Sequence, residues 1–202
     1  MITKTAANNS NRCTTTPENK KFPKFESMIN LLEKNSSKKN TVSLARYLYS
    51  HPEAVSEVLE KIKTESHPVD FRAAWALEVY FINHKKFYPA WANQWAGLLE
   101  KASESCQRHI LKVIAQCKAN YTHEGKLVND CFNLLLNPKT PVAVKAHGLY
   151  FLRKKLKTYP DLNNEFKLTL DQLRYMHTDS PAIQAVIRRC VIVDKHSSNL
   201  EL

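Results

Sequence analysis

The residues that could do chemistry are eight histidines, five cysteines and three tryptophans. The cysteines stand at positions 13, 106, 117, 131 and 190, an odd count without a Cys-x-x-Cys pair. No two histidines are separated by three residues, so the sequence lacks the His-x-x-x-His spacing of a helical metal site. The sequence therefore predicts no cofactor and no metal ion. It also predicts buried, free cysteines, as in a reducing cytoplasm.

Arrangements typical of catalysis are also missing from the sequence. No serine lies in a Gly-x-Ser-x-Gly elbow, and three glycines leave little material for glycine-rich phosphate loops. His109 and His147 are expected to be partly buried packing residues. Trp75, Trp91 and Trp95 are expected to pack mainly in the core, since the last two are one helical turn apart. We therefore predict that the chain is not an enzyme.

The elements that position these residues are predicted to be helices. From Phe25 onward, apolar residues recur at helical spacing, as in Val55, Val58, Leu59 and Ile62. Proline fits the first turn of a helix, where its missing N–H costs nothing. The prolines that we expect to open helices are Pro52, Pro68, Pro89, Pro141, Pro160 and Pro181. The pattern predicts ten helices with short links and no strand.

The domain organisation follows from composition. Residues 1–22 are rich in Thr and Asn and are expected to form a disordered tail. Residues 23–196 are expected to form one helical domain, with a capping pair over 23–50 and four helical hairpins over 51–196. Residues 197–202 are expected to form a second short tail. No apolar run approaches the ~18 residues of a membrane span, which indicates a cytoplasmic protein that does not cross a membrane.

The helical segments contain an internal repeat. The segment Pro68-Val-Asp-Phe-Arg-Ala73 matches Pro141-Val-Ala-Val-Lys-Ala146 position for position. Arg72, Arg108 and Lys145 are separated by 36 and 37 residues. A period of this length that carries two helices indicates a helical-hairpin repeat.

The pattern Pro-x-x-apolar-Arg/Lys-Ala at the start of the second helix resembles the HEAT and armadillo repeat family over residues 52–196. The whole chain is also similar to small, free-standing HEAT-like proteins. This resemblance implies an all-α, right-handed α-solenoid of about five antiparallel helical hairpins. It also implies that the second helix of each hairpin lines the concave surface. We expect the Arg or Lys of the motif to contact the adjacent repeat or its loop.

Charge is distributed unevenly between the two helices of each predicted hairpin. The net charge is +11 overall; the predicted first helices total −4 and the second helices +11. The densest run, residues 153–157, also lies at a helix C-terminus, where the macrodipole favours cations. If the second helices line the concave surface, that surface is basic and attracts anionic partners. The candidate binding residues are Lys112, Lys145, Lys154, Lys157, Arg188 and Arg189.

The predicted function is non-catalytic binding or scaffolding through a basic concave face. The partner is expected to be an acidic protein or a nucleic-acid backbone. The alternative is an enzyme, because HEAT-like DNA glycosylases of the alkylation-repair type are similar in size, basic and all-helical. Their resemblance implies aromatic side chains and an Asp in a concave cleft. No Asp here lies one helical turn from a tryptophan, and Glu78, three residues after Trp75, is the nearest substitute.

Overall fold

The computed structural model describes residues 27, 30, 32–33 and 38–197, and the regular elements within these residues are all helical. The α-helices are α2 (Lys38–Ser50), α3 (Val55–Thr64), α4 (Val69–Asn83), α5 (Tyr88–Gly97), α6 (Glu104–Gln116), α7 (Glu124–Leu136), α8 (Val142–Lys155), α9 (Asn163–Met176) and α10 (Pro181–Ser197). Short 3-10 helices η1 (Pro52–Ala54), η2 (Lys85–Phe87) and η3 (Pro160–Leu162) precede α3, α5 and α9. The predicted tail at 1–22 lies outside the described residues. Of the predicted tail at 197–202, Ser197 is the last residue of α10 and residues 198–202 lie outside the described residues.

The prolines mark helix starts as predicted. Pro52 and Pro160 begin the 3-10 turns that lead into α3 and α9. Pro89 is the second residue of α5, and Pro181 is the first residue of α10. Pro68 and Pro141 stand immediately before α4 and α8, as their N-cap residues. Each proline therefore lies where a helix has no intrahelical acceptor for its N–H, which is why the sequence signal was reliable.

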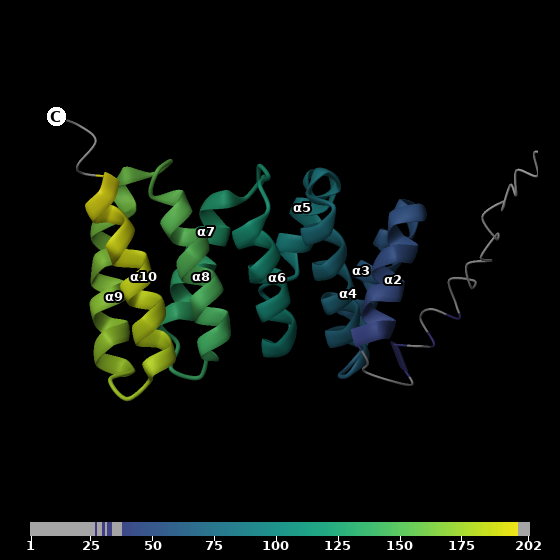
Figure 1. Cartoon of the computed structure of the whole chain (residues 1–202), viewed down its shortest axis with the longest axis horizontal. Coiled ribbons are helices and arrows are strands. Elements are labelled where there is room, and N and C mark those ends of the chain that lie inside the picture. Colours follow the sequence, from purple (N-terminus) through teal and green to yellow (C-terminus); the bar gives the residue numbers. More distant parts are fainter. Residues whose placement is uncertain (1–26, 28–29, 31, 34–37, 198–202) are drawn as a thin grey trace, which may run out of the picture.

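The helices form two layers. The second helices of the hairpins, α2, α4, α6, α8 and α10, pack against one another in chain order. The first helices α3, α7 and α9 pack against α4, α8 and α10, and α5 contacts α6. Figure 1 shows the helices standing side by side along the long axis of the molecule, from α2 at one end to α10 at the other. The right-handed sense of the superhelix and the count of five hairpins stay predictions.

Neighbouring repeats are joined by contacts between residues about one repeat apart. Within the α5–α6 hairpin, by contrast, the indole N–H of Trp95 donates to the Ile110 carbonyl, 15 positions later, at 3.1 Å. Across repeats, the hydroxyls of Tyr88 and Tyr121 lie 3.0 Å apart, and the Cys117 thiol donates to the carbonyl of Phe81, 36 positions earlier. Such contacts recur because each hairpin buries its apolar side only against its neighbours.

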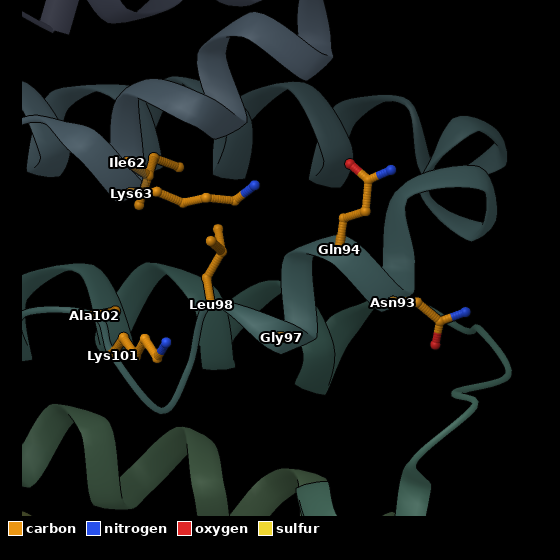
Figure 2. Close-up of a pocket in the computed structure, with 8 residues that line it drawn as sticks. All are labelled: Ile62, Lys63, Asn93, Gln94, Gly97, Leu98, Lys101 and Ala102. Carbon is orange, nitrogen blue, oxygen red and sulfur yellow. The ribbon is translucent and has the colours of Figure 1, made fainter.

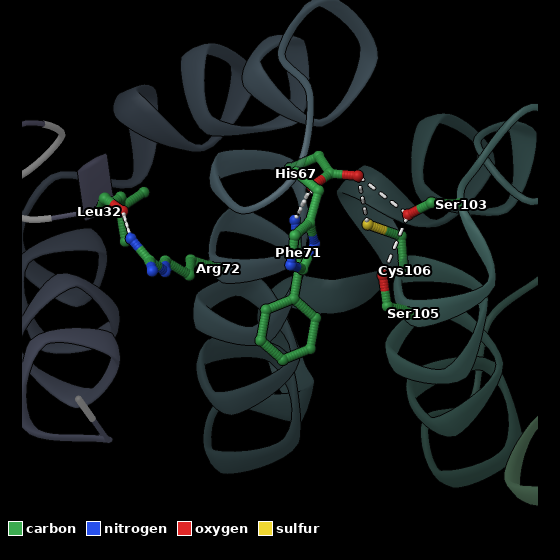
Figure 3. A network of polar contacts seen from close by, with 8 residues as sticks. Leu32, His67, Phe71, Arg72, Ser103, Ser105 and Cys106 are labelled. Carbon is green, nitrogen blue, oxygen red and sulfur yellow. Dashed lines mark hydrogen bonds and ion pairs between the residues drawn. The ribbon is translucent and has the colours of Figure 1, made fainter. Parts of the chain in front are cut away.

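The motif arginine of the first matched segment contacts the preceding repeat, as predicted. Arg72 donates from Nη1 to the carbonyls of Leu32 and Glu33. Two positions earlier, Asp70 accepts hydrogen bonds from Ser103 and Cys106 at the start of α6, at 2.9 and 3.4 Å. Figure 3 shows the contact of Arg72 with Leu32 on one side of α4 and the contacts of Ser103 and Cys106 on the other. The start of α4 is therefore tied to the repeats before and after it.

The core runs through both layers. Trp95 is fully buried, which confirms its predicted core role, whereas Trp75 and Trp91 are half-buried. Cys106, Cys117, Cys131 and Cys190 are buried and form no disulfide, as predicted; Cys13 lies outside the described residues.

Within the part of the chain that the structure describes, no helix has the length and apolar character needed to cross a membrane.

Candidate binding surface

The exposed side of the second layer is built from residues at helical spacing. On α6, Arg108, Lys112 and Gln116 recur every four residues and remain wholly or partly exposed, so they form one stripe. On α8, His147 and Tyr150 are half-buried and continue this surface. The second-layer face consists of Trp75, Arg108, Lys112, Gln116, His147, Tyr150, Arg153, Lys154, Lys157 and Arg189.

A buried carboxylate joins α4 to α6 in the middle of this face. Glu78 keeps only 7% of its side chain exposed, and its Oε1 accepts a hydrogen bond from Lys112 Nζ at 2.6 Å. Its Oε2 accepts from Nδ1–H of His109, because Arg108 donates to the other ring nitrogen at 3.3 Å. Burial by itself raises the pKa of Glu78, but the hydrogen bonds from His109 and Lys112 outweigh burial and hold the pKa below its ordinary value.

Aromatic rings of α4 pack against His109, the imidazole that binds this carboxylate. The His109 ring stacks on Trp75, with centroids 6.4 Å apart and planes inclined by 19°. The Phe71 centroid lies 5.0 Å from the same imidazole. His109 is buried, as the sequence predicted for a packing histidine, whereas Trp75 and Phe71 keep part of their surface exposed. The α4 end of the face is therefore aromatic.

A hollow of about 410 Å³ lies between α6 and α8, at the other end of the face. Most of its lining comes from one side of α8 and from the residues just after that helix. Its polar lining consists of Gln116, His147, Tyr150, Arg153, Lys154 and Lys157. These residues include three cations and no carboxylate, so the hollow is basic.

The three cations at the α6–α8 hollow have no carboxylate partner among the described residues. No ion pair there involves Arg153, Lys154 or Lys157. Lys155, their immediate neighbour in sequence, does pair with Glu124. The difference arises because Lys155 points toward α7 of its own hairpin, while the other three line the hollow. Their charge is therefore available to an anionic ligand.

Two of these cations are anchored by backbone carbonyls. Lys154 Nζ donates to the carbonyl of Ala115 near the end of α6, and Arg153 Nη1 donates to the carbonyl of Arg189 at 3.2 Å. Burial lowers the pKa of Lys154, and the nearby charge of Lys85 adds to the effect. An ammonium has three N–H donors and a guanidinium five, so both groups keep donors for a ligand.

His147 contributes a neutral ring to the same hollow. Burial and, to a smaller extent, the positive charge of Lys112 together lower its pKa to about 4, against the opposing effect of Glu78. At neutral pH the imidazole therefore carries no charge. It can accept or donate a hydrogen bond without adding to the positive potential.

Four of the six predicted binding residues lie together on the second-layer face: Lys112, Lys154, Lys157 and Arg189. Arg189 is joined to α8 through its contact with the Tyr150 hydroxyl at 3.5 Å. Arg188 is exposed on α10, but adjacent residues point about 100° apart on a helix, so it does not share that direction.

The prediction for Lys145 was wrong. Its side chain is fully buried, and its Nζ lies 3.0 Å from Nε2 of His177, so it cannot reach a partner on an exposed surface. Leu149, four residues later, is also fully buried, which places position 145 on the packed side of α8. Summing charge over whole helices could not separate this side from the exposed one.

Sequence reasoning missed four residues of this face. Arg108 and Arg153 were noted only as parts of a repeat and of a charge run, and Gln116 and Tyr150 were not noted at all. The spacing of Arg108, Lys112 and Gln116 was an available signal, since residues four apart share a helix face.

Two further hollows border other helices. One, of about 500 Å³, lies where α3 and α5 diverge; Figure 2 shows Ile62 and Lys63 facing Leu98 across it. Its lining mixes apolar groups, amides and two lysines, so no single chemistry dominates. The other, of about 710 Å³, lies beside the α6–α7 connection and shares Lys154 and Lys157 with the α6–α8 hollow. These two lysines therefore stand between two neighbouring hollows.

The described residues contain no group of three or more His, Cys, Asp or Glu side chains that could hold a metal ion. Of the comparisons with known proteins, the one with protein families agrees with the architecture. The family model of the HEAT repeat domain matches residues 28–193, and the chain belongs to this family of helical repeat proteins. No curated protein and no solved structure matches the chain. HEAT repeats generally serve as scaffolds for protein interactions.

Proposed function

We propose that this HEAT protein is a binding module whose second-layer face, the concave one if the solenoid curves as its family implies, captures an acidic segment of a partner protein. The observation that carries the proposal is the α6–α8 hollow, where three cations lack a carboxylate partner among the described residues. Opposite potentials steer partners together and select among them. The proposed role is binding, with no catalytic step.

A protein partner is favoured over a nucleic-acid backbone by the other end of the face. Trp75 and Phe71 are partly exposed and pack against His109, which shares the Glu78 carboxylate with Lys112. Exposed aromatic side chains are typical anchors of protein interfaces. The glycosylase alternative gains no support from the geometry. Glu78 is near Trp75, but both of its carboxylate oxygens are engaged by Lys112 and His109, away from solvent.

The test is a binding titration with a labelled aspartate-rich peptide at several salt concentrations. We expect binding at low salt that weakens steadily as salt screens the charges. Lys154→Gln/Lys157→Gln should weaken binding several-fold. The control Lys139→Gln/Lys167→Gln removes the same charge from exposed positions elsewhere and should change affinity less than about twofold.

Two outcomes would contradict the proposal. One is the absence of salt-sensitive peptide binding at low salt. The other is tighter binding of a single-stranded DNA oligonucleotide of equal charge. For about four phosphate contacts, the logarithm of its affinity would fall against log salt with a slope near −3. That result would identify a nucleic-acid backbone as the partner.

A further inference from the structure

We infer that the α6–α8 hollow is a binding site for a phosphorylated side chain of the acidic partner. This inference rests on the proposed function, because it assigns one particular group of the bound segment to one place on the second-layer face.

The donors at the hollow suit a phosphoryl group better than a carboxylate. Arg153, Lys154 and Lys157 supply three positive charges, and Gln116 and Tyr150 supply an amide and a hydroxyl. A phosphorylated side chain carries about −1.5 to −2 charges and three strong acceptor oxygens, whereas a carboxylate has one charge and two oxygens. One carboxylate would therefore leave positive charge uncompensated.

The hollow is also preorganised. The Ala115 carbonyl holds Lys154, and the Arg189 carbonyl holds Arg153, so these cations need little reordering when an anion arrives. Tyr150 is held in turn by the Arg189 guanidinium at 3.5 Å.

The size of the hollow fits one side chain. Its volume of about 410 Å³ lies near the lower end of ordinary ligand pockets, roughly 300–1,000 Å³. The neighbouring hollow of about 710 Å³ begins on the far side of Lys154 and Lys157 and adds Lys118 to the lining. It offers a path for the acidic residues that flank the phosphorylated one.

The experiment compares two labelled aspartate-rich peptides of equal length and equal net charge. One carries a central phosphoserine. The other carries an aspartate at that position and a second aspartate in place of a neutral residue, which matches the phosphate's charge of about −2. Above the second phosphate pKa of about 6, we expect the wild-type protein to bind the phosphopeptide about tenfold more tightly. Equal affinity for the two peptides overturns the inference and leaves the proposed function standing.

A charge-neutral variant locates the site. Gln116→Ala/Tyr150→Phe removes the two uncharged donors and should reduce the tenfold preference to about threefold or less. Its affinity for the control peptide should fall less than its affinity for the phosphopeptide, because the lysines remain. The matched control Gln172→Ala/Tyr175→Phe changes the same residue types at exposed positions on α9 and should keep the full preference.

The remaining outcomes also decide the matter. If Gln116→Ala/Tyr150→Phe keeps the full preference, the phosphoryl group binds elsewhere and the assignment to this hollow is wrong. If neither peptide binds, the proposed function fails together with the inference. Circular dichroism and thermal melting show whether each variant is folded. If Gln116→Ala/Tyr150→Phe is unfolded, the single variant Tyr150→Phe is tested in its place.

Discussion

The Lys145 amine on α8 lies 3.0 Å from the imidazole Nε2 of His177, the C-cap residue that follows α9. Lys145 is fully buried, and burial lowers its pKa. The pKa of His177 is lowered by burial and by the Lys145 charge. Lys145 occupies the motif position for which we expected a contact with the adjacent repeat. Its burial means that keeping this amine protonated costs free energy in the folded protein.

Replacing that amine should stabilise the protein. Lys145→Met keeps the side-chain length and removes the desolvation cost, so we expect the free energy of unfolding to rise by about 1 kcal/mol or more. Because the folded pKa is below the ordinary 10.5, the unfolded chain binds more protons in alkaline solution and wild-type stability rises with pH there. Denaturant titrations between neutral and alkaline pH should show a smaller rise in Lys145→Met. A destabilised variant would show that the amine contributes favourably.

The buried tryptophan is expected to dominate the core between the first and second layers. Trp95 packs edge-on against Phe81 at 5.4 Å and donates to the Ile110 carbonyl. Trp95→Ala should cost ~3–5 kcal/mol, as other large-to-small core changes do. Thermal or denaturant unfolding measures the loss. Tyr175→Ala, at a site that is 85% exposed, should change stability by less than about 0.5 kcal/mol; similar losses in both variants would refute the assignment.

The carboxylate between α4 and α6 is expected to stabilise their contact. Glu78→Gln leaves Lys112 and His109 without their charged acceptor and should cost about 1–3 kcal/mol. A double-mutant cycle with Lys112→Met should give a coupling of at least about 0.5 kcal/mol. Asp179→Asn makes the same chemical change at an exposed position and should have little effect. A coupling of zero would mean that the ion pair adds nothing to stability.

His147 should make the protein less stable in weak acid. Its pKa falls from the ordinary 6.5 to about 4 on folding, so the unfolded chain binds more protons between these values. The associated stability is complete above pH 6.5 and is lost as the pH falls toward 4. Besides burial, the neighbouring groups Lys112, Arg108 and His109 lower the pKa of His147, and Glu78 raises it. In His147→Gln, the thermal melting midpoint should therefore depend less on pH between 6.5 and 4 than in the wild type. If the pH dependence of the midpoint is unchanged, other groups cause the acid sensitivity.

The sequence alone determined the helices and their order. Pro68, Pro141 and Pro181 stand at or next to helix starts because the missing proline N–H is a local property of the backbone. The repeat of Arg72 and Lys145 likewise predicted contacts between hairpins, because each apolar stripe can be buried only against the next one.

Only the tertiary structure decided which side of each second-layer helix is exposed. Lys145 and Lys154 belong to the same basic helix, yet one is fully buried and the other lines the α6–α8 hollow. The rotation of α8 about its axis separates them, and that rotation is set by packing against α6, α7 and α10. Charge summed along a helix carries no information about this rotation. The pairing of Glu78 with Lys112, 34 positions away, depends on the same packing.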